Sequence, residues 1–419
     1  MKKFLAFVLL CFVLFGATAQ TPTYWLLDKE RSWQKNGGLM IQAHGNGNWG
    51  SNALDNQWFY DMTIGGHIGP TQEETLFNSM EDFNRAGGNV SGGLHFYNFS
   101  DSLFGGDWGL QVGASTNYFA STGFSRDLFE LTYIGNYRHL GDTMNLGPLY
   151  AEFQAFQKFG FGFFNKNTFT NAMVSVVMGQ DMQKLDVRKA DLFTSASVDQ
   201  MNLIYQGEFL QADTSKSGFG QAKGLGIALD GDINIPMKDD KGFISISARN
   251  IGWVNWSENT SVQEFDTTFQ WTGVELQGID SWENNVGVPS WQDTLGISSR
   301  FESRWVPLPG WVNLRLLRKL SSKISYEANL NVQPTSNAIP QLSFGFNHFV
   351  AKGLMLRERI SYGGFARVTI GLEAQWKLSD RWFITAGTSH AAGWVNSNAR
   401  GLSAYGSAAF VIPSHSISE

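Results

Sequence analysis

The chain has 419 residues, of which only 16% are charged, whereas 14% are aromatic and 46 are glycines. Ordinary soluble domains carry about 25% charged residues and about 7% glycine, so this composition argues against a simple soluble domain. The formal net charge of -6 comes without any block of basic residues, and we therefore expect no nucleic-acid partner.

The N-terminal segment predicts export. Lys2 and Lys3 precede an apolar run that ends at Phe15, and the small residues Ala17 and Ala19 follow. This order is typical of a cleavable secretory signal peptide, so residues 1–19 are expected to be removed. The only cysteine lies within this segment, which leaves the mature chain without disulfides. The absence of disulfides is compatible with a fold that is held closed by backbone hydrogen bonds.

A glycine-rich stretch and a helix are expected next. Residues 44–48 read His-Gly-Asn-Gly-Asn; no helical pattern follows them, so a flexible loop is favoured over a phosphate site. Thr71 with Glu74 resembles a capping box, and residues 76–83 carry apolar side chains at helical spacing. They predict a short amphipathic helix. It would cap the mouth of a barrel, enter its pore or lie on a surface loop.

Alternation of apolar and polar residues recurs along the rest of the chain. It is complete at residues 324–333 and 366–378 and clear at 108–118, 225–235 and 342–347. A period of two predicts β-strands with one apolar face. At about 3.3 Å per residue, the longest of these segments spans about 40 Å, enough to cross the ~25 Å apolar band of an outer membrane when tilted.

Weaker alternation, including residues 58–64 and 129–137, raises the number of candidate strands to about eighteen. Residues 181–199 mix charges with apolar residues without a period, and predict either a periplasmic loop or a plug folded into the barrel.

Short polar turns join many strands, which indicates sequential antiparallel pairing. They fall at residues 236–242, 320–323, 351–353, 363–364 and 379–381. If the last strand ends in the periplasm, all of these but the turn at 363–364 lie on the periplasmic side, where such barrels have short turns. A soluble sandwich would alternate as well, but strand length, strand number and the signal peptide favour a membrane protein.

The sequence therefore predicts an all-β fold, an antiparallel up-and-down transmembrane β-barrel of 14–18 strands, with a short helix or plug elements in its loops. We expect residues 20–57 to form an N-terminal extension, a first strand or a plug, residues 58–412 the barrel, and residues 413–419 a tail. The predicted location is the outer membrane.

Tryptophans near strand ends indicate an interfacial girdle. Trp376 and Trp382 flank the turn at Ser379. The others lie near further strand ends: Trp253, Trp256, Trp305, Trp311 and Trp394.

If the apolar faces meet lipid, the opposite faces line the lumen, where charges of both signs form a salt-bridged interior or a wet pore. The candidate lumen-facing residues are Asp230, Asp232, Arg249, Arg315, Glu327, Asn329, Arg357, Arg359, Arg367 and Glu373. A structural role in the lumen wall and contact with a substrate are both open for each.

Catalysis and metal binding are not expected. None of the seven histidines has the spacing of a metal site, and the mature chain has no cysteine. Adjacent Ser389 and His390 would face opposite sides of a strand and make a poor nucleophile and base. We therefore expect no enzyme activity, no cofactor and no metal.

One segment carries a recognisable signature, ISISARNIGWVNW at residues 244–256. It resembles a Gram-negative family of outer-membrane barrels of unknown function, related in style to FadL-type barrels. Residues 133–143, 190–195, 226–236, 269–276 and 361–371 support the resemblance. Barrels of this kind often end on an aromatic residue, whereas here Phe410 is followed by Val411, Ile412, Pro413 and a polar tail.

The resemblance implies fold and location better than activity. It implies passive uptake or binding of a small hydrophobic compound, with outer-membrane lipid and the barrel-assembly machinery as partners. The alternative is a structural barrel that binds a partner protein in a cell-surface secretion or motility assembly. The loop at residues 278–293 and the lack of a recognisable substrate site favour that alternative.

Overall fold

The computed structural model describes residues 38–104, 106–216, 220–239, 241–272, 297–334 and 337–413. The predicted signal peptide, the loop at residues 278–293 and residues 414–419 of the predicted tail lie outside the described residues.

Fourteen strands close into one antiparallel barrel. The last strand pairs with the first from Gly38 opposite Pro413 to Gly50 opposite Gly401. The predicted fold class is confirmed, and the barrel begins inside the segment that was expected to hold an extension, first strand or plug. In ring order the strands are β1 (Gly38–Ser51), β2 (Phe83–Leu103), β3 (Trp108–Ser125), β5 (Leu149–Asn165), β6 (Asn171–Thr194), β8 (Gly224–Pro236), β9 (Gly242–Trp256), β13 (Trp311–Lys319), β14 (Ile324–Val332), β15 (Ile339–Ala351), β16 (Leu354–Gly364), β17 (Val368–Lys377), β18 (Trp382–Thr388) and β19 (Gly401–Pro413).

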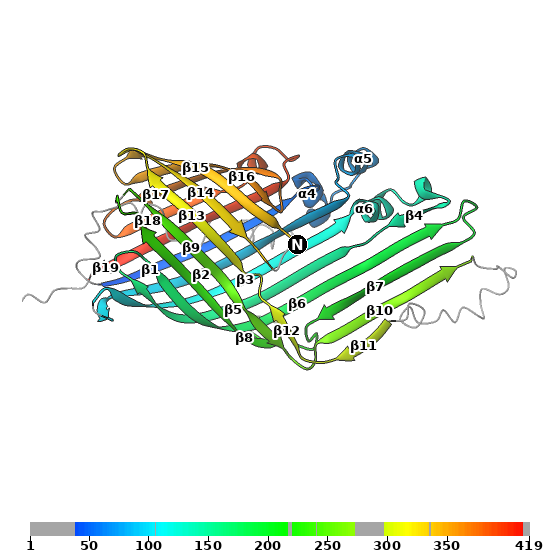
Figure 1. The fold of residues 1–419 in the computed structure, drawn as a ribbon, viewed down its shortest axis with the longest axis horizontal. Helices are drawn as coiled ribbons and strands as arrows, with labels where there is room; N and C mark the ends of the chain where they lie inside the picture. The colour runs from blue at the N-terminus through cyan, green and yellow to red at the C-terminus, as the bar shows by residue number, and fades with distance from the viewer. Residues whose placement is uncertain are drawn as a thin grey trace, which may run out of the picture.

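The two ends of the barrel differ. At one end, here called the turn end, short connections join β8 to β9, β13 to β14, β15 to β16 and β17 to β18, as the turn residues predicted. Gly38 and Pro413 lie at this end. At the opposite end, the loop end, the chain makes long excursions that contain every helix of the described residues (Figure 1).

The excursions hold five further strands and the helices. They are α4 (Asn56–Ile64), α5 (Pro70–Asn78), α6 (Arg126–Tyr133), the 3₁₀ turns η1 (Tyr137–His139) and η3 (Ala391–Trp394), and the strands β4 (Asp142–Asn145), β7 (Met201–Gln211), β10 (Ser261–Trp271), β11 (Ile297–Phe301) and β12 (Arg304–Pro307). No helix in these parts of the chain is long and apolar enough to cross a membrane.

Residues 181–194 are neither a loop nor a plug, contrary to the prediction, and only residues 195–199 form a turn. β6 continues to Thr194 and changes partner near Gln180, where its ladder with β5 is irregular. On the edge of β6 that faces away from β5, the residues on the turn-end side of Gln180 pair with β8. Those on the loop-end side pair with β7, which in turn pairs with β10. Hydrogen bonds to the neighbouring strands keep this segment extended beyond the part of the barrel whose outer face is apolar. Neither of its faces therefore needs the alternating apolar residues that identify a membrane strand.

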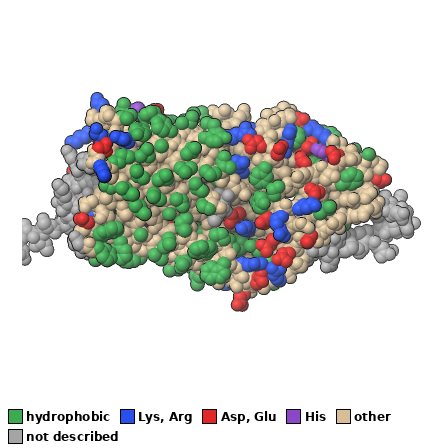
Figure 2. Space-filling view, viewed as in Figure 1, with side chains coloured by type: hydrophobic (Ala, Val, Ile, Leu, Met, Phe, Trp, Pro, Cys, Tyr) green, Lys and Arg blue, Asp and Glu red, His purple; other side chains and the backbone are tan. Residues whose placement is uncertain are grey.

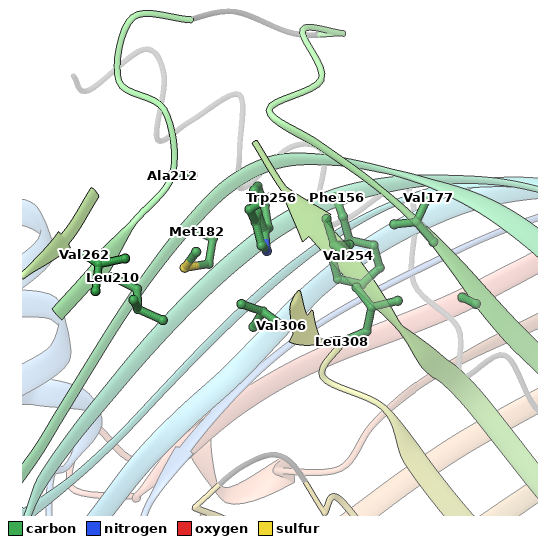
Figure 3. Packing of buried hydrophobic residues seen from close by; sticks show 11 residues of the cluster. Phe156, Val177, Met182, Leu210, Ala212, Val254, Trp256, Val262, Val306 and Leu308 are labelled. Atoms are coloured by element: carbon green, nitrogen blue, oxygen red, sulfur yellow. The ribbon is translucent and has the colours of Figure 1, made fainter. Parts of the chain in front are cut away.

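A buried apolar cluster fixes the base of this extension (Figure 3). Trp256 is fully buried there, and Leu308, which follows β12, packs into the same cluster. The ring of Trp256 approaches the backbone of Gly179 so closely that a Cβ there would lie 2.8 Å from it. Only glycine fits at that position. The cluster consists of Phe156, Val177, Met182, Leu210, Ala212, Ala228, Val254, Trp256, Val262, Val306 and Leu308.

Two predicted weak strands are helices instead. Residues 58–64 belong to α4, because Asp55 accepts a hydrogen bond from the Trp58 N–H and Gly65 ends the helix in the left-handed conformation. Residues 129–133 belong to α6, where the Ser125 hydroxyl accepts from the Leu128 N–H. These caps satisfy helix termini that an alternation pattern does not reveal.

The helix predicted after residue 70 is present as α5, but its capping box is wrong. Pro70 occupies the first turn, so Gly69 is the N-cap and Thr71 lies inside the helix. Leu76 packs α5 against the loop ends of β2 and β3. No residue of α5 lines the lumen cavity described below. Residues 44–48 were predicted as a loop and instead lie in β1, where both neighbouring strands pair with them.

The outer face of the barrel is apolar. Along β17 the outward residues Val368, Ile370 and Leu372 are 52–60% exposed, whereas Thr369 and Glu373 are buried. Figure 2 shows apolar side chains covering the barrel half of this face, with charged side chains gathered over the loop-end extension and in a small group at the turn end. The faces assigned from the alternation are therefore observed.

The predicted girdle is only partly present. Trp376, Trp382 and Trp253 are 45–52% exposed; the first two flank the turn between β17 and β18. Trp256, however, is buried in the apolar cluster and Trp311 lines the lumen, so neither belongs to an interfacial belt.

Leu372→Arg tests the lipid face, since this residue is the third of five outward apolar side chains on β17. We expect the free energy of unfolding to fall by roughly 2–4 kcal/mol, the cost of arginine at the membrane midplane. The measurement is urea unfolding in lipid vesicles, with Leu372→Val as the matched control. Equal stability of both variants would contradict this assignment.

Candidate luminal binding site

The lumen is packed with apolar side chains at the turn end. Phe164 and Met40 are fully buried, and the Phe164 and Phe99 rings meet edge to face with centroids 4.8 Å apart. On the opposite arc of the barrel, Leu317 and Met355 are also fully buried. We call the first group the luminal seal; it consists of Met40, Phe99, Phe164, Phe169, Phe383, Ala409 and Val411.

A belt of buried ion pairs lies above the seal. Lys158 Nζ is 2.7 Å from a carboxylate oxygen of Asp230, and Arg249 is 2.7 Å from Asp232. The Asn250 side-chain oxygen and its backbone N–H bind Lys158 and Asp230, respectively. Paired and hydrogen-bonded charges of this kind tolerate burial that isolated charges do not.

The second part of the belt is centred on Arg357. Its guanidinium is 3.3 Å from Glu327 and 3.1 Å from Glu373, and its Nε donates to the Asn347 side chain at 2.8 Å. The Tyr405 hydroxyl donates to Glu373 at 2.8 Å. The charged belt is defined here as Lys158, Asp230, Asp232, Arg249, Arg315, Glu327, Arg357 and Glu373.

Nine of the ten candidate residues lie on the inner face of the wall. Eight are at most 9% exposed: Asp230, Asp232, Arg249, Arg315, Glu327, Asn329, Arg357 and Glu373. Arg359 is half-buried and lines the lumen cavity. Arg367 lies elsewhere, in the turn before β17, where it is 46% exposed and paired with Glu81 of the loop end. The predicted strand was begun too early, because β17 starts only at Val368.

Sequence reasoning missed Lys158, His44 and His95. Lys158 lies on β5, whose aromatic-rich run only weakly alternates, and its pairing with Asp230 joins positions 72 residues apart. His44 was placed in a predicted loop. In the structure its ring lies 5.0 Å from that of His95 on β2. The parity of β1 would have found His44 if its strand had been recognised.

A cavity, here called the chamber, extends from the charged belt towards the loop end. The volume of the chamber that the centres of water molecules can occupy is about 270 Å³. Amides are its commonest side chains, since eight asparagines and two glutamines line it: Asn46, Asn48, Asn89, Asn117, Asn250, Asn313, Asn329, Asn331, Gln333 and Gln341. An amide both donates and accepts hydrogen bonds, so this lining suits a partner that does the same.

Some amides bind one another, and other polar atoms of the chamber have no protein partner. The Asn48 amide donates to Asn89 at 2.6 Å, and Asn46 donates to Ser91 at 3.1 Å. Within the described parts of the chain, the unpartnered buried atoms of the lining are His95 Nδ1, Ser175 Oγ, Asn313 Oδ1, Asn331 Oδ1, Arg359 Nε and His390 Nδ1. Buried polar groups are normally satisfied, so these closely packed atoms are exceptions within the lining.

Ser389 and His390 do not form a catalytic pair. The Ser389 hydroxyl contacts the Ser403 hydroxyl at 3.0 Å rather than the histidine. Burial, followed by the nearby Arg359 charge, lowers the pKa of His390 to about 4, so its ring is neutral at pH 7. Among the described residues, no group of three or more histidine, cysteine or acidic side chains is placed to hold a metal ion.

A closed barrel with an apolar exterior, a polar lumen and short turns at one end defines a transmembrane β-barrel. The chain belongs to the family of unknown function DUF5723, whose model matches residues 161–386, more than half of the chain. The membership in a family of unknown function that the sequence indicated is confirmed. No curated protein matches the chain.

The chain resembles several solved transport barrels. The toluene transporter TodX of Pseudomonas putida shares 10% identity with a TM-score of 0.44, covering 94% of this chain and 95% of that chain. A FadL homologue of Pseudomonas aeruginosa shares 9% identity with a TM-score of 0.40, covering 94% and 99%. Scores at this level do not bear on what the present chain binds.

Arg357→Met tests the charged belt. We expect a loss of about 3–5 kcal/mol in the free energy of unfolding, because two buried carboxylates lose their partner. The measurement is thermal or urea unfolding of the barrel in detergent. Arg318→Met is the matched control, since Arg318 pairs with Asp239 on the surface and such pairs contribute about 0–1 kcal/mol. Similar losses in both variants would show that the belt is not a buried network.

Proposed function

We propose that this protein is an outer-membrane barrel that binds a small hydroxylated compound in its chamber, with the loop end facing the cell exterior. The single observation that carries the proposal is the chamber itself, a cavity lined by ten amide side chains above a packed luminal seal.

The orientation follows from the difference between the ends. Outer-membrane barrels have short periplasmic turns and longer external loops, and the turn end has only short connections. A chamber near the loop end is then reached from outside. The export signal predicted from the N-terminal sequence agrees with this location.

The lining favours a polar compound over the hydrophobic one that the sequence resemblance implied. An apolar ligand would remove water from the ten lining amides without replacing its hydrogen bonds, and each polar group left unsatisfied costs about 1–3 kcal/mol. Hydroxyl groups match them. Trp311 also lines the chamber, is only partly buried and offers a flat apolar surface to the carbon skeleton.

Binding is tested by titrating the purified barrel in detergent with sorbitol, glucose and, as the hydrophobic alternative, toluene. We expect the hydroxylated compounds to bind and toluene not to. Ser343→Phe should abolish binding, because Ser343 lines the chamber and the larger ring fills it. Ser343→Ala is the matched control and should bind normally. Binding of toluene alone, lost in Ser343→Phe, would favour the hydrophobic cargo instead.

The structural-barrel alternative is favoured by the luminal seal, since a scaffold needs no path through the membrane. Conductance in planar bilayers separates the cases. We expect no steady conductance from the wild-type barrel and stable open steps from the double variant Phe164→Ala, Phe383→Ala, because removing both rings opens the seal. A conducting wild-type barrel would contradict the seal. A barrel that binds none of the hydroxylated probes and copurifies with a stoichiometric partner would favour the scaffold.

A further inference from the structure

Arg359 is placed unlike the other luminal arginines. Its register neighbours are Gly345 on β15 and Gly371 on β17, so neither adjacent strand offers it a side chain. Arg357, the inward residue one step nearer the turn end, lies between Asn347 and Glu373 and binds both. Two inward arginines of β16 thus differ, because Arg357 has a polar side chain on each neighbouring strand and Arg359 has none.

The glycines leave the guanidinium open to the chamber. A Cβ on Gly345 would lie 3.2 Å from Arg359 Cβ and one on Gly371 3.4 Å from Arg359 Nε, so a side chain at either position would lie against Arg359. Arg359 lines the chamber together with Ser343, Ser389 and His390. Its Nε is buried and has no hydrogen-bond partner in the described parts of the chain, and no carboxylate among them lies within ion-pair distance.

The charges of the belt balance one another without Arg359. The charged belt has four cations, Lys158, Arg249, Arg315 and Arg357, and four carboxylates, Asp230, Asp232, Glu327 and Glu373. Arg359 adds one further positive charge next to the belt. His390 faces it as a neutral ring at pH 7. Arg359 interacts electrostatically with Glu327 of the belt but forms no ion pair with it, and an anion entering the chamber would pair with the guanidinium directly.

We propose that Arg359 binds the carboxylate of a hydroxylated monoanion, so that the compound recognised by the chamber is a sugar acid or a similar hydroxy acid. The inference rests on the proposed function and names the charge of its ligand. The planar fork of arginine matches a carboxylate in a bidentate manner. The amide lining would bind the hydroxyl groups of the same molecule.

The test compares gluconate with sorbitol, which carries the same chain of hydroxyl groups but a CH₂OH group in place of the carboxylate. Affinities are measured by calorimetry on the full barrel in detergent at pH 7 and constant ionic strength. For the wild type we expect gluconate to bind at least about tenfold more tightly than sorbitol, the effect of one charge-assisted interaction.

Arg359→Gln should remove this preference and change the affinity for sorbitol less than about twofold, since the neutral part of the ligand keeps its contacts. Arg359→Lys retains the charge but not the fork and should recover part of the preference. Arg300→Gln, at an exposed arginine of the loop-end extension, is the matched control and should keep the wild-type preference. Heat-modifiable migration on gels checks that each variant is folded.

The outcomes separate this inference from the proposed function. Equal binding of sorbitol and gluconate, or a gluconate preference that persists in Arg359→Gln, would overturn the role of Arg359 while leaving a hydroxylated ligand in place. Absence of binding by both probes would overturn the proposed function and this inference with it. A preference that is lost in Arg359→Gln and partly recovered in Arg359→Lys supports the carboxylate site.

Discussion

Everything in this protein depends on the closure of the backbone ladder between β1 and β19. A strand edge in lipid would leave its N–H and C=O groups unsatisfied, at several kilocalories per mole each. The long pairing from Gly38 to Gly50 removes that edge. Once the ring is closed, each strand must turn alternate side chains to lipid and to the lumen, and the apolar exterior and polar interior follow.

Closure also creates an interior that has to be filled. A small eight-stranded barrel is filled by its own side chains, whereas porins of 16–18 strands keep an aqueous channel. The present ring lies between these sizes and divides its lumen. Aromatic side chains such as Phe164 pack the turn end, paired charges such as Arg357 and Glu373 line the wall at its middle, and the chamber lies towards the loop end.

The division suggests how a sealed barrel can still recognise a small molecule. Recognition needs convergent polar groups with unmet hydrogen bonds, and these occur in the chamber but not in the seal. Passage through the lumen, in contrast, would require the luminal seal to open. The geometry therefore supports binding more directly than passive flow, and the glycines on both sides of Arg359 leave it without a cross-strand side-chain partner.

The sequence by itself determined the class, the polar and apolar faces and the turns, because alternation is a local property that a closed barrel enforces at every membrane strand. It predicted Glu327 and Arg357 inside from parity alone. It did not reveal that β6 changes partner near Gln180, that Asp55 and Ser125 cap helices, or that Arg367 leaves the wall. Those features depend on pairing and caps set by the tertiary structure. Likewise, only the register between strands placed Gly345 and Gly371 beside Arg359 and Lys158 against Asp230, since contacts across the ring join residues far apart in the chain and leave no periodic trace.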